Sequence, residues 1–265
     1  MARKISGLEI RGAVGMDFLR HHIIQLDVSA GMASILDGSI ADPASLGMAI
    51  PIDPTADGPS VAVCLPGQHE AERFLIDTGS TNVAQMTPAL LSVLQVDGTG
   101  RKVGDTLSAG LSQIKANEKW MVVDLAIGGA KESRILVTKS PVNSLGIGFF
   151  TRYCVTFDFP NSMMYIKRRS HDPLPFDLDV SGLHLLRTEG KTIVHSIDSG
   201  SAADRAGVLP GDILTGLDGV SITCVSMHRL RHRFCQQGAR IDLQITRGQR
   251  NLECTITLSR PLAGP

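Results

Sequence analysis

The chain has 265 residues, a length that accommodates two compact domains. Hydrophobic residues make up 43% and charged residues 20%, an ordinary balance for a globular protein. Because the formal net charge is zero, the composition gives no support for a nucleic-acid partner or for binding to an anionic membrane. Aromatic residues are few, at 4%, and the 27 glycines favour strands joined by tight turns, so we expect a mainly β protein.

The residue pattern also argues against a metal, a cofactor or a membrane span. The five cysteines are odd in number and include no Cys-x-x-Cys pair, so buried free thiols are the simplest interpretation, with a disulfide left open. His228 and His232 lie four residues apart, but no third ligand accompanies them, which favours a solvated helix face over a metal site. No stretch reaches the roughly 18 apolar residues of a membrane helix. The compartment stays open: an upstream signal would imply the cell envelope or secretion, and its absence the cytoplasm.

An internal repeat is the first informative feature along the chain. Residues 12–36 align without gaps with residues 143–167, and five positions are identical: Gly15/Gly146, Phe18/Phe149, Asp27/Asp158, Met32/Met163 and Ile35/Ile166. Each copy predicts an apolar glycine turn, a short helix, a strand, a tight turn and a second strand. We interpret the two segments as copies of a duplicated structural unit.

Between the two copies the sequence predicts strands and one helix. Residues 87–96 predict a helix, because Thr87 is a suitable N-cap and Pro88 suits the first helical turn. Alternating apolar runs around turn residues predict two hairpins, formed by residues 60–67 with 71–77 and by residues 119–129 with 133–140.

Two turn-rich segments, residues 37–59 and 170–179, are expected to be linkers. They divide the chain into three parts. Residues 1–40 form the closing half of a preceding lobe and a linker, residues 41–169 form a complete lobe, and residues 170–265 form a separate domain.

The sharpest local signal is the sequence Asp77-Thr78-Gly79-Ser80 at the end of an apolar strand. It matches the catalytic motif of aspartic proteases, although an ordinary strand-ending turn could have the same sequence. An apolar-glycine element at residues 144–150 follows in the order typical of retropepsins. Residues 59–168 therefore resemble a retropepsin-like aspartic protease lobe with a β-barrel fold, and we assign this lobe to residues 41–169.

This resemblance implies an aspartic endopeptidase that hydrolyses peptide bonds through a water activated by Asp77. In such enzymes two neighbouring aspartates share one proton, because both cannot ionise cheaply. The resemblance assigns Thr78 to locking two acid turns together, Gly79 to close backbone packing, and Ser80 to a hydrogen bond near the carboxylate. A flap is expected within residues 105–117, where no substrate-binding residue is assigned.

The chain offers one convincing catalytic aspartate, and a dyad needs two. The sequence Asp198-Ser199-Gly200 is rejected as the second site, because its surroundings fit a different domain. The repeat spacing would place an equivalent acid upstream of Met1. We therefore expect a second acid-protease lobe as partner, supplied by a missing upstream half-lobe or by a homodimer, with the upstream half-lobe favoured and a degenerate first lobe left open.

The C-terminal region resembles bacterial PDZ domains over about residues 180–260. The resemblance rests on several glycine and apolar motifs at the family's spacing, namely Gly182-Leu183-His184-Leu185, Gly200-Ser201-Ala202-Ala203, Ala206-Gly207-Val208, Gly211-Asp212-Ile213-Leu214 and Leu217-Asp218-Gly219. PDZ domains bind peptides by β-augmentation and capture a terminal carboxylate in the loop before the edge strand.

The PDZ resemblance implies that this domain binds a peptide or protein substrate. The expected contacts come from the loop and strand on one side and from a helix on the other: Gly182, Leu183, His184, Leu185, Leu230 and Phe234. The alternative is a catalytically inactive scaffold protein in which only the PDZ domain is functional.

Overall fold

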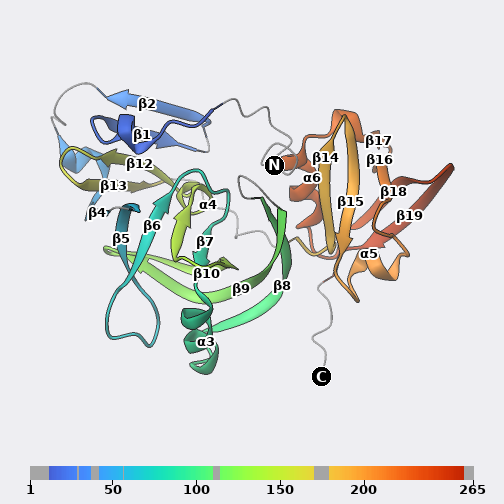
Figure 1. Ribbon diagram of the computed structural model, residues 1–265, viewed down its shortest axis with the longest axis horizontal. Coiled ribbons are helices and arrows are strands. Elements are labelled where there is room, and N and C mark those ends of the chain that lie inside the picture. The colour runs from blue at the N-terminus through green and yellow to red at the C-terminus, as the bar shows by residue number, and fades with distance from the viewer. Residues whose placement is uncertain are drawn as a thin grey trace. The chain divides into compact units, whose positions relative to one another are not determined.

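The computed structural model describes residues 12–28, 30–36, 42–55, 57–109, 114–169 and 179–259. The chain divides into two compact units (Figure 1), the first formed by residues 12–103 and 118–176 and the second containing residues 177–265 together with the described residues 104–109 and 114–117. Most of the expected linker at residues 170–179 lies outside the described residues, as does the centre of the expected flap at residues 110–113.

One sheet of the first unit joins the two copies of the repeat. Its strand order is β2-β1-β12-β13-β3, and all pairs are antiparallel. The bounds are β1 (Ile23–Asp27), β2 (Met32–Leu36), β3 (Met48–Pro51), β12 (Tyr153–Asp158) and β13 (Met163–Arg168). Gln25 on β1 lies opposite Thr156 on β12, its own equivalent in the repeat, and donates a hydrogen bond to it at 3.0 Å. A local pseudo-twofold axis therefore passes through this pair.

The two copies have the same local geometry. The helices α2 (Met16–Leu19) and α4 (Ile147–Phe150) begin after glycine N-caps whose φ angles are both −89° and whose ψ angles are 174° and 175°. In each turn between strands an aspartate accepts a main-chain hydrogen bond three residues on, Asp27 from Ala30 at 3.0 Å and Asp158 from Asn161 at 3.2 Å. The repeated sequence thus folds twice into one local structure.

A second sheet, most of which belongs to the first unit, has eight strands in the order β4-β5-β6-β11-β7-β10-β9-β8, and β5 also pairs with β9. The predicted hairpins are confirmed by the β5–β6 and β9–β10 pairs. The bounds are β4 (Asp53–Thr55), β5 (Gly58–Cys64), β6 (Glu72–Asp77), β7 (Ala84–Met86), β8 (Gly100–Ala109), β9 (Ile114–Ile127), β10 (Ala130–Lys139) and β11 (Ser144–Gly146).

Two further short helices belong to this unit, η1 (Pro43–Leu46) and α3 (Pro88–Val96). The predicted start of α3 is confirmed, because Thr87 Oγ1 accepts a hydrogen bond from Leu90 N at 3.4 Å and Pro88 occupies the first turn. Leu90, Leu91 and Leu94 turn inward from this helix, as its apolar spacing requires.

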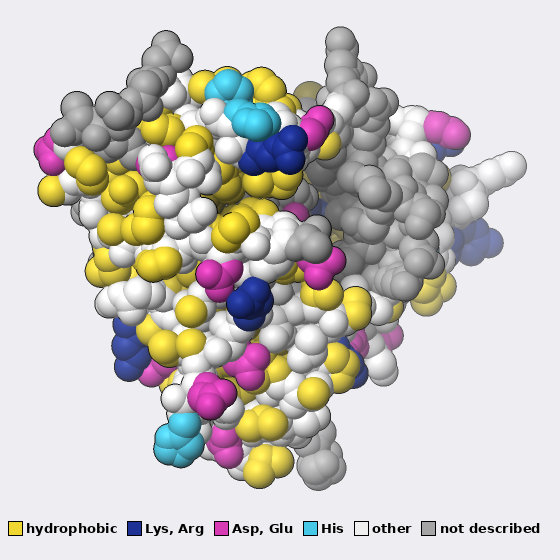
Figure 2. Space-filling view, turned by 60° about the vertical axis from the view of Figure 1, so that its left-hand side comes forward, with side chains coloured by type: hydrophobic (Ala, Val, Ile, Leu, Met, Phe, Trp, Pro, Cys, Tyr) yellow, Lys and Arg dark blue, Asp and Glu magenta, His cyan; other side chains and the backbone are white. Residues whose placement is uncertain are grey.

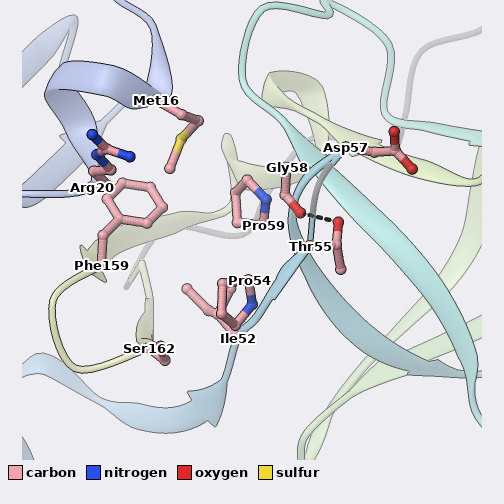
Figure 3. Close-up of a pocket in the computed structure, with 10 residues that line it drawn as sticks. All are labelled: Met16, Arg20, Ile52, Pro54, Thr55, Asp57, Gly58, Pro59, Phe159 and Ser162. Atoms are coloured by element: carbon pink, nitrogen blue, oxygen red, sulfur yellow. Dashed lines mark hydrogen bonds between the residues drawn. The ribbon is translucent and has the colours of Figure 1, made fainter.

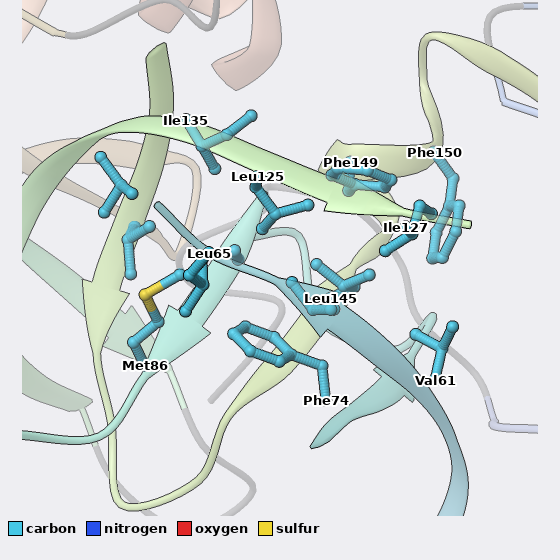
Figure 4. Close-up of a cluster of buried hydrophobic side chains, with 14 of the residues drawn as sticks. Val61, Leu65, Phe74, Met86, Leu125, Ile127, Ile135, Leu145, Phe149 and Phe150 are labelled. Atoms are coloured by element: carbon cyan, nitrogen blue, oxygen red, sulfur yellow. The ribbon is translucent and has the colours of Figure 1, made fainter. Parts of the chain in front are cut away.

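The core of the first unit is a single apolar cluster enclosed by strands of both sheets and by α3 and α4. Figure 4 shows Phe74 from β6, Leu125 and Ile127 from β9, and Phe149 and Phe150 from α4 converging on this cluster. Burial of such large side chains contributes roughly 1.5–3 kcal/mol each. The short helix α4 is therefore held by tertiary packing, since four residues form no stable helix alone.

Gly146 marks the closest approach of two segments, since a Cβ there would lie 2.1 Å from the main-chain oxygen of Asn82. We expect Gly146→Ala to destabilise the unit by at least about 3 kcal/mol, the upper part of the overpacking range. At its repeat equivalent Gly15, a Cβ meets only the flexible side chain of Asp17, at 2.6 Å. Urea denaturation of both variants checks this: Gly15→Ala should stay within about 1 kcal/mol of the wild type, and equal losses would contradict the close approach.

The second unit contains a sheet in the order β14-β15-β16-β18-β19, with β17 paired to β16. Its elements are β14 (Leu183–Thr188), β15 (Lys191–Ile197), α5 (Ala202–Arg205), β16 (Ile213–Leu217), β17 (Val220–Ser221), η2 (Ile222–Cys224), α6 (Met227–Phe234), β18 (Arg240–Arg247) and β19 (Arg250–Thr257). The expectation of a mainly β protein is confirmed.

None of the five cysteines, all of which lie in the described part of the chain, forms a disulfide, but the expectation that they are buried is wrong. Cys64 and Cys224 are exposed and the other three are partly exposed, because Cys64 lies at an outward-facing strand position and Cys224 lies in a short surface helix. Among the described residues, no helix is long and apolar enough to cross a membrane.

Candidate functional site

The second unit presents a strand edge beside a helix. β14 ends the sheet and pairs with β15 on one side, and no other strand of the described residues pairs with its outer edge. The helix α6 runs antiparallel to β14 and is tied to it at both ends. Val180 N donates to Phe234 O at 3.1 Å, and Arg187 Nη2 donates to Val225 O at 3.0 Å. Strand and helix therefore lie side by side, in the places expected for the two walls of a peptide-binding groove.

The loop before β14 is closed by its own hydrogen bonds. Asp179 Oδ1 accepts from Ser181 N at 2.9 Å and from Ser181 Oγ at 2.6 Å, and Ser181 Oγ in turn accepts from Leu183 N at 3.0 Å. Ser181 and Leu183 are buried. The N–H groups of Ser181 and Leu183, which lie in the loop expected to capture a ligand carboxylate, thus already donate hydrogen bonds to side chains of the protein.

His184 and Asp198 form a polar contact at the start of β14, where His184 Nε2 lies 2.6 Å from Asp198 Oδ1. The two residues belong to neighbouring segments, since Asp198 N also donates to Gly182 O at 3.0 Å. Gly182 has a φ of 74°, and a Cβ there would lie 2.1 Å from the Cβ of Ser201. Glycine is therefore required at this position for both backbone conformation and space.

The helix residues expected to line the groove are buried. Leu230 and Phe234 retain 0% and 1% of their exposure, and with Met227 they form the inward stripe of α6. The helix begins at a regular N-cap, where Ser226 Oγ accepts from Arg229 N at 3.1 Å. Leu230 and Phe234 thus act in the described structure as core residues that fix the helix.

The structure brings the six predicted groove residues into one region, on β14, its preceding loop and α6. Sequence reasoning assigned no role to the side chains of Asp179 and Ser181, which accept hydrogen bonds from the loop N–H groups. Their Asp-x-Ser spacing is a signal that could have found them, because Asp and Ser side chains commonly bind main-chain N–H groups two residues on.

The Asp77 segment lies at the end of β6 in the first unit. β6 pairs in parallel with β11, so that Asp77 lies opposite Gly146. The side chain of Asp77 is exposed, and its Oδ1 accepts a hydrogen bond from Gly79 N at 3.2 Å. Thr78 is exposed, and Ser80 Oγ accepts hydrogen bonds from Asn82, not from a group near the carboxylate. No hydrogen bond or ion pair among the described residues joins Asp77 to a second acid.

The first unit also contains a cavity of about 480 Å³. Figure 3 shows that α2 contributes Met16 and Arg20, the turn after β12 contributes Phe159, and the β4–β5 region contributes the opposite wall. No residue predicted as a site from the sequence lines this cavity. The described residues contain no group of three or more His, Cys, Asp or Glu side chains that could hold a metal ion.

Comparison with known proteins identifies the second unit. The family model described as PDZ domain matches residues 179–258, so this part of the chain is a PDZ domain, as its sequence predicted. Comparison with curated proteins gives no match.

Two solved structures are similar to parts of the chain. One is a photosystem II D1 C-terminal processing protease, with 18% identity, a TM-score of 0.27, and coverage of 31% of this chain and 23% of that chain. The other is an HtrA-type protease with a decapeptide, with 11% identity, a TM-score of 0.33, and coverage of 62% of this chain and 63% of that chain. The chain thus spans less than two thirds of either structure.

These findings correct the interpretation as a retropepsin-like aspartic endopeptidase, which is wrong. The family model that matches the chain is a PDZ domain, and it describes no acid-protease lobe. The surroundings of Asp77 also argue against catalysis, because its carboxylate is exposed and has no acidic partner among the described residues. A proton-sharing dyad requires two carboxylates in contact. Asp77, Thr78, Gly79 and Ser80 are therefore not assigned to catalysis.

Proposed function

We propose that the chain binds an extended segment of another protein in the groove between β14 and α6. The observation that carries this proposal is the outer edge of β14, which pairs with no strand of the described residues and lies beside a helix. An added strand would complete the main-chain hydrogen bonds of this edge by β-augmentation. No reaction is assigned to the first unit.

The turn after β14 indicates which main-chain groups would face the ligand. Thr188 and Lys191 flank a two-residue loop whose φ angles are both positive, 51° and 73°, as in a type I′ hairpin. The pair that flanks such a loop exchanges hydrogen bonds, and the direction of these groups alternates along the strand. In this proposal the N–H and C=O groups of Leu185 and Arg187 point toward the ligand.

The loop before β14 favours an internal peptide segment over a free C-terminus. The N–H groups of Ser181 and Leu183 already bind Asp179 and Ser181 Oγ. A terminal carboxylate would have to displace these bonds and would stand beside the charge of Asp179, which is unfavourable at short range. Ligand affinity would then come from the main chain along β14 and from side chains that contact the groove walls.

Selection of decapeptides from a synthetic library against the full chain tests the proposal. We expect selected peptides to bind with micromolar affinity by calorimetry, and to lose about tenfold or more in affinity when alternate main-chain nitrogens are methylated, because methylation removes the ladder hydrogen bonds. Failure of every peptide to bind, or full retention of affinity by the methylated forms, would contradict β-augmentation.

The same peptides test the closed loop. Each selected peptide should bind equally well with a free C-terminal carboxylate or as an amide, within about threefold. The variant Ser181→Ala frees Leu183 N–H and should shift this ratio toward the free acid. A wild-type preference for the free acid of more than about tenfold would show that the loop opens to capture a carboxylate.

A further inference from the structure

The two copies of the repeat share one backbone geometry but differ in how their apolar side chains are covered. In the second copy three apolar side chains are almost fully buried, whereas their equivalents in the first copy are largely exposed. The exposed fractions are 0% for Leu145 against 65% for Val14, 0% for Phe149 against 42% for Phe18, and 3% for Ile166 against 53% for Ile35.

The difference in exposure arises because residues 80–83 cover the second copy. The N–H groups of Gly146, Ile147 and Gly148 donate to main-chain oxygens of residues 80–83 at 2.8–3.1 Å. The equivalent N–H groups at residues 15–17 donate to no main-chain oxygen among the described residues. The apolar side chains of the first copy are therefore exposed where those of the second copy are buried. Its main-chain N–H groups at residues 15–17 also make none of the hydrogen bonds that the equivalent groups make in the second copy.

The outer strand edges differ in the same way. In the second copy β13 pairs on its outer side with β3, with Met164 opposite Ile50 and Tyr165 opposite Ala49. The equivalent strand β2 ends the sheet, and no described strand pairs with its outer side. The side of the molecule where Figure 1 labels β1 and β2 comes forward in Figure 2, which shows hydrophobic side chains spread widely over it.

The sequence of β2 leaves this edge unprotected. Its residues Met32-Ala33-Ser34-Ile35-Leu36 include no charge, no proline and no glycine. Proteins usually protect an open edge with charged residues or proline, because an open edge pairs readily with another strand. An unblunted apolar edge is a ready template for pairing with a strand of another chain.

We propose that β2 pairs antiparallel with β2 of a second copy of this chain, about a twofold axis at Ser34. In this register Ala33 lies opposite Ile35 of the second copy, and Met32 opposite Leu36 of the second copy. No like charges meet, and the pairing closes after two chains, as isologous dimers do. The proposal concerns the first unit and is independent of the peptide groove.

The same kind of antiparallel pairing about a twofold axis already occurs within the first unit. β1 and β12 are equivalent strands of the two copies, and they pair antiparallel about a pseudo-twofold axis at Gln25 and Thr156. The proposed β2 pairing applies the same operation at the next strand edge. The zero formal net charge of the chain offers no long-range repulsion to a second copy.

Sedimentation equilibrium of the full chain tests the association. We expect a monomer–dimer equilibrium in the micromolar range, weakened at least about tenfold by Ile35→Lys, because a charge would then lie in the strand interface. The matched control is Val96→Lys, which alters an apolar side chain of α3 that is 87% exposed. A monomer at every concentration, or equal behaviour of the two variants, would overturn the proposal.

Disulfide trapping tests the register. In Ser34→Cys the two introduced thiols lie directly opposite, with Cα atoms about 4.5–5.5 Å apart, within the range for a disulfide. In the control Ala33→Cys they lie on a diagonal about 7–8 Å apart, which is too far. Mass spectrometry should identify a disulfide between the two introduced thiols, distinct from any that involves a native cysteine. Equal cross-linking of both variants would exclude the twofold at Ser34.

Discussion

Replacement of Glu132 by glutamine is expected to destabilise the first unit by about 3–5 kcal/mol, the usual loss when one partner of a buried ion pair is removed. Glu132 is 1% exposed and lies on β10. Its carboxylate binds the guanidinium groups of Arg152 and Arg168 and the hydroxyl of Tyr153. Arg152 is itself buried, so loss of the negative charge of Glu132 leaves less charge to balance its guanidinium group.

The pKa values of this cluster give the pH dependence of the effect. Burial alone would raise the pKa of Glu132, but hydrogen bonds from Tyr153 and Arg168 and the charges of both arginines hold it below its ordinary value of 4.5. Burial and the neighbouring carboxylate raise the pKa of Tyr153. A carboxyl group with a lowered pKa stabilises the fold above its unfolded-state pKa, and this contribution is lost as the pH falls through the folded-state value.

Urea denaturation of the wild type and Glu132→Gln at neutral and acidic pH measures both effects. The difference in free energy of unfolding should be largest near neutrality and should shrink below about pH 4.5. The exposed pair of Asp53 with Arg73, 3.1 Å apart, supplies the control. Asp53→Asn should cost less than about 1 kcal/mol. A Glu132→Gln variant as stable as Asp53→Asn would show that the cluster contributes little.

Truncation of Phe149 to alanine is expected to cost about 3–5 kcal/mol, whereas the same change at Phe18 should cost less than about 1 kcal/mol. The two phenylalanines are equivalent in the repeat, yet Phe149 is fully buried and Phe18 is exposed. Phe149 packs edge-on against Phe150 at 5.4 Å and stacks on Tyr153 at 5.9 Å. Its removal leaves a cavity that a close-packed core fills poorly.

Thermal and urea denaturation of the two variants at low protein concentration measures this contrast. Low concentration keeps any association through the first copy from stabilising the wild type relative to Phe18→Ala. Similar losses for the two variants would mean that the first copy is as well covered as the second, against the exposure found for Phe18.

Local signals in the sequence predicted much of the fold. The N-cap Thr87, the two hairpins and the internal repeat depend on neighbouring residues, and the structure contains each of them. The PDZ domain was predicted from several motifs at fixed spacing. The pairing of β1 with β12 could not be predicted in this way, because residues so far apart in sequence are joined by tertiary packing alone.

Sequence reasoning was less successful for the sites. The tetrapeptide beginning at Asp77 indicated catalysis, but a turn motif describes one carboxylate and cannot supply a second one beside it. In the PDZ domain the strand and helix were placed correctly. The side-chain bond from Ser181 Oγ to Leu183 N depends on a rotamer, which sequence patterns do not specify. Leu230 and Phe234 were expected to contact the ligand but are buried in the core. Their apolar spacing predicts burial, but it does not say whether a ligand or the protein itself covers them.

The pairing of Gln25 with Thr156 also has a consequence during synthesis. The two residues are 131 positions apart in the chain, so a ribosome that adds 5–20 residues per second exposes β1 for on the order of 10 seconds before β12 emerges. During that interval the nascent apolar strand lacks its native long-range partner, and contacts of such large sequence separation form slowly. Until translation has passed residue 158, the edge of β1 that pairs with β12 is therefore open to pairing with other strands.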